Sequence, residues 1–278
     1  MIPRIPGLQP PGNPSCPARE TPASFASSRP NATIGNVMPD FKLLGPVEVR
    51  DEYAGILALR GPKIRQAISL LALNAGRTVG FDQFIDELWP ARTPKDALKT
   101  LQTHIYYLRR MLGPAAGPLV VTRPAGYVLH ADADRVDALV FPRLVARAGE
   151  QAREGRTAAA ERLLERALGL WSGYTALADV PLGFVLGPPA TALDQQRLRA
   201  QETSIDLRIT LGRHTELIEE VRALVAAHPL NETFHSQLIT ALTRAGRRTD
   251  ARRAYEGLRI LLDAELGVKP TFDLPALH

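Results

Sequence analysis

The chain has 278 residues, of which 45% are hydrophobic, and its 34 lysines and arginines exceed its 29 acidic residues by a net charge of +5. This length predicts two compact domains, because a typical domain holds about 100–150 residues. No stretch approaches the roughly 20 apolar residues that cross a bilayer and no secretory signal opens the chain, so we expect a soluble, cytoplasmic protein that binds no membrane.

Residues 1–37 are predicted to be a disordered, proline-rich tail. Eight prolines lie among Ser, Ala, Asn and Gly, a composition with too little apolar surface to offset the entropy of ordering. We expect two domains after it, at residues 38–131 and 132–278. Residues 39–130 hold 12 lysines and arginines against eight acidic residues, with the excess between Arg92 and Arg123. Clustered basic charge favours a polyanion partner, although a solvated surface carries such charge equally well.

The first domain is predicted to open with short strands and two helices. Apolar residues around a Gly-Pro turn indicate two strands within residues 41–50, and a third strand is expected at 56–59. Helical spacing follows from Pro62 to a cap at residues 74–76, and again over residues 81–88, where Pro90 prevents continuation.

A third helix is predicted at residues 94–112, opened by the hydroxyl of Thr93 and by Pro94 at the first helical position. Two strand-like runs follow at 119–122 and 127–130, joined by a tight turn. Strands, three helices and a closing hairpin make a winged helix-turn-helix of α+β class. The predicted buried stripe of the third helix consists of Leu98, Leu101, Ile105, Leu108 and Leu112.

The outer face of this third helix carries the candidate DNA-binding residues. In a winged helix this helix enters the major groove, where cations meet guanine edges or phosphates and polar side chains meet bases. Arg123 in the wing is placed for the minor groove, and Lys63 and Arg65 are candidate phosphate contacts. One basic residue alone is more often a solvated surface group, so the prediction depends on the ordered set. On the helix that set is Lys95, Lys99, Thr103, Tyr106 and Arg110, flanked by Gln102 and Tyr107.

The second domain is predicted to be all-α and tetratricopeptide-like, which makes the whole chain mainly α. Amphipathic segments such as residues 158–171 and 191–211 are rich in Ala, Leu, Arg and Glu. Gly212-Arg213 recurs as Gly246-Arg247, 34 residues on, which is the tetratricopeptide period. Stacked repeats of this kind usually form a protein-binding surface, although chance recurrence in an Ala/Leu-rich chain is the alternative.

The sequence shows no catalytic apparatus. Its six histidines have no metal-ligand spacing, Cys16 is the single cysteine, and no nucleophile elbow or phosphate-binding glycine loop is present. We therefore predict a non-enzymatic protein with no catalytic residues, no cofactor and no metal.

The chain resembles the Streptomyces antibiotic regulatory protein family over almost everything from residue 41 to residue 278. The motifs in the first half are FKLLGPVEV (41–49), GPKIRQAISLLALNAGR (61–77), DELW (86–89), LQTHIYYLRRML (101–112) and TRPAGYVL (122–129). Those in the second half are DRVDAL (134–139), ALADVP (176–181), LGRHTELI (211–218), HPLNE (228–232) and ELGVKP (265–270). Two features depart from the family: Tyr106-Tyr107 is bulkier than usual, and residues 271–275 are atypical, so a short closing helix is expected.

The resemblance implies a winged helix like the output domains of response regulators, followed by a bacterial transcriptional activation domain of tetratricopeptide-like helices. It further implies an activator of antibiotic biosynthetic genes that binds direct repeats near the −35 element as a head-to-tail dimer. Its partners would be duplex promoter DNA and RNA polymerase holoenzyme, including the principal sigma subunit. A winged-helix repressor and a tetratricopeptide scaffold remain alternatives, which footprint position and salt-dependent DNA affinity would distinguish.

Overall fold

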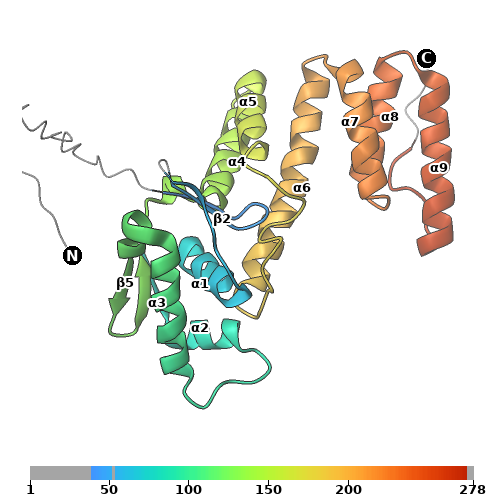
Figure 1. Ribbon diagram of the computed structural model, residues 1–278. Coiled ribbons are helices and arrows are strands. Elements are labelled where there is room, and N and C mark those ends of the chain that lie inside the picture. The colour runs from blue at the N-terminus through green and yellow to red at the C-terminus, as the bar shows by residue number, and fades with distance from the viewer. Residues whose placement is uncertain (1–38, 52–53, 274–278) are drawn as a thin grey trace, which may run out of the picture. The chain divides into compact units, whose positions relative to one another are not determined.

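The computed structural model describes residues 39–51 and 54–273 (Figure 1). The predicted tail at residues 1–37 lies outside the described residues. No helix within the described ranges is long and apolar enough to cross a membrane.

The first sheet is antiparallel, in the order β1-β2-β3, with bounds β1 Asp40–Lys42, β2 Glu48–Asp51 and β3 Gly55–Leu57. Phe41 pairs with Val49, which pairs in turn with Leu57. Phe41 and Val49 are fully buried, as expected for strands with one face on a core. The three strands predicted at the start of the domain are confirmed.

Two helices and an unpredicted strand follow: α1 Pro62–Leu73, β4 Thr78–Gly80 and α2 Phe81–Leu88. The predicted bounds of both helices are confirmed. The strand β4 was missed, because three residues are too short to show an alternating pattern and β4 pairs with a distant partner, β6.

Helix α3, Ala97–Ala116, corrects the predicted start of the third helix. Asp96 occupies the N-cap position, so Thr93 and Pro94 precede the helix by several residues and do not cap it. The buried stripe begins at Ala97, and Leu98, one residue and about 100° further round, is 50% exposed. The predicted end at 112 holds, since the backbone breaks at Gly113 with φ 70° and ψ −169°.

The wing is a hairpin of β5 Val120–Arg123 and β6 Gly126–Leu129, preceded by a 3₁₀ turn, η1 Gly117–Leu119. With β4 it forms a sheet in the order β4-β6-β5. Gly126 is required here, because a side chain would collide with the carbonyl of Val79. The ring of Tyr127 packs edge-on against Phe81 and Phe84, which fixes the hairpin to α2. The predicted hairpin is confirmed.

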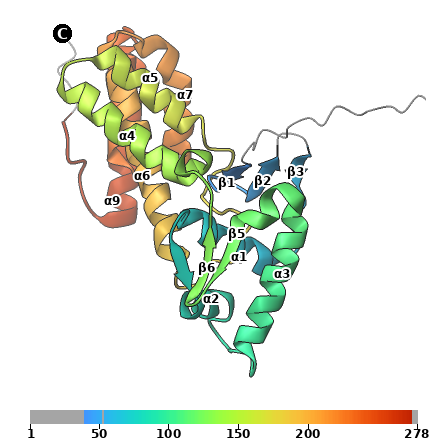
Figure 2. The same cartoon turned by 90° about the vertical axis from the view of Figure 1, so that its left-hand side faces the viewer.

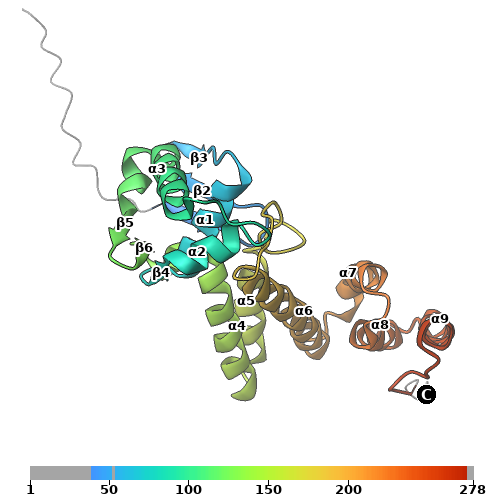
Figure 3. The ribbon, with the colours of Figure 1, turned by 90° about the horizontal axis from the view of Figure 1, so that it is seen from below.

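The regular elements in the rest of the described chain are all helices, with a long loop between α5 and α6 (Figure 3). A 3₁₀ turn, η2 Ala133–Arg135, leads into six helices. Neighbours in the chain pack on one another, most extensively α4 with α5, α5 with α6, α7 with α8 and α8 with α9, whereas α6 meets α7 and α8 more lightly. Their bounds are α4 Asp137–Arg153, α5 Thr157–Leu168, α6 Gly187–Thr210, α7 His214–Ala227, α8 Glu232–Arg244 and α9 Arg248–Leu266. The predicted all-α domain is confirmed.

The Gly-Arg pairs that suggested the repeat lie in the turns that join α6 to α7 and α8 to α9. Gly212 and Gly246 are left-handed, with φ 81° and 76°, and the next arginine N–H returns to the preceding helix. This is the Schellman motif. A third copy at Gly155-Arg156, with φ 75° at the glycine, was missed because its distance from the others does not match the 34-residue period.

Two hydrophobic cores divide the chain inside α6. The first contains Phe41, Leu101 and Phe141 and joins the winged helix to α4, α5 and the first half of α6. The second contains Ile205, Phe234 and their neighbours up to α9. The winged helix and the first helical hairpin therefore share one continuous core, although the sequence motifs divide at residues 131–132.

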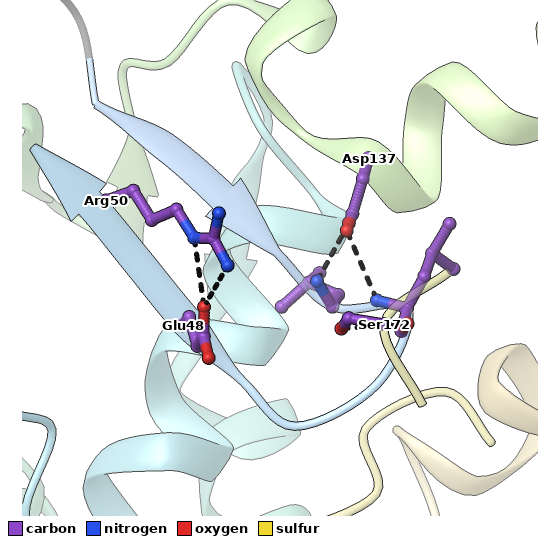
Figure 4. Close-up of polar contacts among 6 residues, drawn as sticks. Glu48, Arg50, Asp137 and Ser172 are labelled. Carbon is purple, nitrogen blue, oxygen red and sulfur yellow. Dashed lines mark hydrogen bonds and ion pairs between the residues drawn. The ribbon is translucent and has the colours of Figure 1, made fainter. Parts of the chain in front are cut away.

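Two buried acidic side chains, Asp137 and Glu87, link the winged helix to the helical part through hydrogen bonds. The Asp137 carboxylate, at the start of α4, accepts the backbone N–H groups of Leu43 at 2.8 Å and Leu44 at 3.3 Å (Figure 4). Burial raises the pKa of Asp137, and the bonds from Leu43 and Leu44 oppose that rise.

Glu87 of α2 bonds three backbone N–H groups of the loop before α6. Its side chain is fully buried and accepts the backbone N–H groups of Gly183 at 2.7 Å and of Val185 and Leu186 at 2.9 Å each. Gln66 of α1 adds a bond to the carbonyl of Pro181 at 2.8 Å. The loop between α5 and α6 is thus held directly by the helices of the winged-helix domain.

Candidate DNA interface

The outer face of α3 is exposed along its length. The exposed side chains on this face are Lys99, Gln102, Thr103, Tyr106, Tyr107 and Arg110, and Lys95 is exposed in the turn before the helix. The opposite face is closed by Leu101, Ile105, Leu108 and Leu112, each at most 1% exposed. The structure therefore places seven of the ten candidate residues on or beside one accessible face.

This face has positive charge available for a ligand. Lys95, Lys99 and Arg110 form no ion pair with any residue of the described ranges. The hydroxyl of Thr103 donates to the carbonyl of Lys99 at 3.0 Å, which leaves its oxygen free to accept a bond. Unpaired cations beside a hydrogen-bonding group suit phosphates and base edges.

Two aromatic side chains extend the same face. Tyr106 is 58% exposed and Tyr107 is 47% exposed, and their rings meet edge-on at 5.6 Å. Their hydroxyl groups and ring edges add hydrogen bonding and apolar area to the cationic surface.

The wing presents Arg123 at the end of β5, where it is exposed. One of its terminal nitrogens lies 3.2 Å from Nε2 of His130, a residue that the sequence did not single out. Figure 2 shows the β5–β6 hairpin beside α3, so the wing lies next to the helix that carries most of the candidate residues.

Arg109 connects that helix to the wing, and sequence reasoning missed it. Its Nε donates to the carbonyl of Val120 and its terminal nitrogen to Oγ1 of Thr122, both at 2.9 Å. The guanidinium also lies 5.8 Å from the ring centre of Tyr127. Adjacent arginines on a helix point about 100° apart, so the Arg109-Arg110 pair was a signal that only one faces outward.

Lys63 and Arg65, the two candidate phosphate contacts of α1, are partly exposed and each has a partner inside the chain. Lys63 donates through Nζ to the carbonyl of Leu88 at the end of α2. Arg65 forms an ion pair with Asp179, with Nε and Oδ2 3.0 Å apart. These contacts give both side chains a structural role, because they tie α1 to α2 and to the loop after α5.

His104 and Trp89 fill the flank of α3. Their rings lie 5.9 Å apart, and burial, assisted by the charge of Lys63, lowers the pKa of His104. Trp89 packs partly buried against the first core. Within the described part of the chain no cluster of three or more His, Cys, Asp or Glu residues could hold a metal ion.

Two known protein families match this chain, one over the winged helix and one over the helical part. Residues 59–129 match the family "Transcriptional regulatory protein, C terminal", and residues 136–278 match the "Bacterial transcriptional activator domain". Both are descriptions of transcription-regulator domains and not of enzymes.

Relatives align with most of the chain. "Regulatory protein DnrI" of Streptomyces peucetius is 35% identical over 244 residues, covering 85% of this chain and 89% of the relative. "Transcriptional regulator RedD" of Streptomyces coelicolor is 35% identical over 236 residues, covering 83% and 67%. The solved structure "Mycobacterium tuberculosis EmbR in complex with low affinity phosphopeptide" has a TM-score of 0.77 and 31% identity, covering 86% of this chain and 64% of that one.

Proposed function

The chain belongs to the Streptomyces antibiotic regulatory protein family of DNA-binding transcriptional regulators, and we propose that it activates a biosynthetic gene cluster for a secondary metabolite. It does so by binding direct repeats beside the −35 element and recruiting RNA polymerase holoenzyme.

The observation that carries the proposal is the exposed face of α3 with its unpaired cations next to the wing. Lys95, Lys99 and Arg110 neutralise phosphates or meet guanine edges, while Arg123 approaches the minor groove. Gln102, Thr103, Tyr106 and Tyr107 provide base contacts. Lys63 and Arg65 are left out of this assignment because each has an internal partner.

Recruitment of polymerase, including its principal sigma subunit, is assigned to the helical part. The loop between α5 and α6 exposes two aromatic side chains, with Tyr174 97% and Phe184 74% exposed. Aromatic residues are enriched at protein interfaces, so these two are our candidates for a polymerase contact. On direct repeats the protein would act as a head-to-tail dimer in the cytoplasm.

The test is a mobility-shift and footprinting titration on intergenic DNA from the chain's own gene neighbourhood. Two salt concentrations separate charge-driven binding from sequence readout, and a random duplex of the same length is the matched control. We expect protection of direct repeats beside a −35 element, strengthened when RNA polymerase is added. Protection over the transcription start would indicate a repressor instead, and no protection beyond the random duplex would indicate a protein scaffold.

A further inference from the structure

A groove of about 420 Å³ lies where the winged helix meets the helical part. It is lined by the end of α1, by α4, by α6 and by the loop just before α6. A volume of this size suits a drug-sized ligand, and such sites are common where two domains meet. The groove includes no residue of α3 or of the wing, so it is separate from the proposed DNA interface.

The walls of the groove are mainly apolar. Leu73, Leu139 and Val185 line it and are only partly buried, so they keep apolar surface open to a ligand. Leu70 and Leu193, at 1% and 7% exposure, form the base that joins it to the first core. A molecule with an apolar body would cover surface that is now in contact with water.

The rim of the groove is polar and carries one cation. Arg77, exposed in the turn after α1, has no acidic partner among the residues that the structure describes. Gln83 uses its carbonyl oxygen to accept the N–H of Gly80 at 2.9 Å, which leaves its amide N–H₂ as a donor. Gln196 of α6 also lines the groove. These groups offer donors and one positive charge at the edge of an apolar site.

We propose that this groove binds a small amphipathic molecule, whose apolar body lies along the leucine walls and whose carboxylate or other anionic group pairs with Arg77. A planar guanidinium forms bidentate, charge-assisted bonds with such groups, which an apolar wall alone does not provide. Because the walls come from both the winged helix and the helical part, the bound molecule adds contacts across their junction.

The probe for this site is 8-anilinonaphthalene-1-sulfonate, an apolar aromatic anion whose fluorescence rises on transfer to an apolar site. It is titrated into the natively folded full chain, with far-ultraviolet circular dichroism to verify the fold. We expect a saturable fluorescence rise with one strong site for each chain. Arg77→Gln should weaken this binding about fivefold, as expected for a partly solvated ion pair.

Two further variants make the test specific. Ala192 of α6 is exposed and lines the groove, so Ala192→Phe should fill it and weaken binding about tenfold or more without opening the core. Arg162→Gln, an exposed arginine of α5 outside the groove, removes the same charge and should leave binding unchanged. Binding that survives both Arg77→Gln and Ala192→Phe would overturn the site. Probe binding that is lost with Ala192→Phe but kept with Arg77→Gln would overturn the pairing of an anionic group with Arg77.

Discussion

Replacing Glu87 by glutamine tests whether the winged helix and the helical part are held together as one folded unit. The carboxylate of Glu87 is fully buried and accepts three backbone N–H groups from the loop before α6, at 2.7, 2.9 and 2.9 Å. Glutamine keeps the shape of the side chain but turns one acceptor oxygen into a donor. If the amide nitrogen replaces Oε1, the N–H of Gly183 loses its acceptor; if it replaces Oε2, the N–H groups of Val185 and Leu186 both lose theirs.

The size of the effect follows from two opposing terms. A buried donor that loses its acceptor costs about 1–3 kcal/mol, and bonds to a charged acceptor are worth about 1.5–3 kcal/mol. The neutral amide, however, carries no desolvation penalty of a buried charge, and this difference offsets part of the lost stability. We therefore expect a destabilisation of about 2 kcal/mol, which for a chain of this size lowers the midpoint of thermal unfolding by roughly 4–8 °C.

Differential scanning calorimetry of the full chain measures this midpoint, with Glu165→Gln as the matched control. Glu165 is exposed on α5, so its replacement should shift the midpoint by no more than about 1–2 °C. A midpoint for Glu87→Gln that coincides with that of Glu165→Gln would refute the assignment of Glu87 as the junction between the two parts.

Three other predictions concern the wing, the helical part and pH. Arg109→Lys should weaken DNA binding about fivefold with an unchanged salt slope, because lysine keeps the charge but cannot bridge Val120 and Thr122; an unaltered affinity would contradict the positioning role. Phe184→Ser should leave DNA affinity unchanged but lower polymerase-dependent transcription in vitro, and equal transcript yield would remove Phe184 from the polymerase contact. The pKa of Asp137 is raised above its ordinary 3.8, so the folded state holds this proton more tightly than the unfolded chain. Its contribution to stability should therefore fall as pH rises from about 4 through the raised folded value, a fall that Asp137→Asn abolishes; parallel stability–pH curves for the two proteins would contradict this.

The sequence predicted correctly the elements that have a helix-stopping residue at each end. Helix α2 matches its predicted range because helical spacing lies between Gly80 and Pro90, each of which stops a helix. The start of α3 was wrong because Thr93-Pro94 resembles a helix opening, whereas burial against the core begins only at Ala97. Tertiary contact decided between two starts that local propensity could not separate.

The candidate site likewise has parts that follow from local sequence patterns and parts that depend on tertiary contacts. The exposed face of α3 follows from the period of its apolar residues, so its side chains could be named from the sequence. The roles of Arg109, Arg65 and Glu87 could not, because their partners lie in other elements that only the fold brings close. An isolated basic residue such as Lys63 carries no local mark that separates a phosphate contact from a helix-end bond.

The most direct test of the central claim is the salt dependence of DNA affinity for Lys99→Ala. Lys99 is exposed in the first turn of α3 on the proposed interface, and alanine keeps the helix propensity of α3. Fluorescence anisotropy titrations on the footprinted duplex, at several salt concentrations, give the slope of log affinity against log salt. We predict weaker binding with a slope reduced by about one unit, as expected for the loss of one phosphate contact. Lys269→Ala, which removes an exposed lysine after α9, should keep the wild-type affinity and slope. Equal affinities and slopes for Lys99→Ala and the wild type would contradict the placement of DNA on this face of α3.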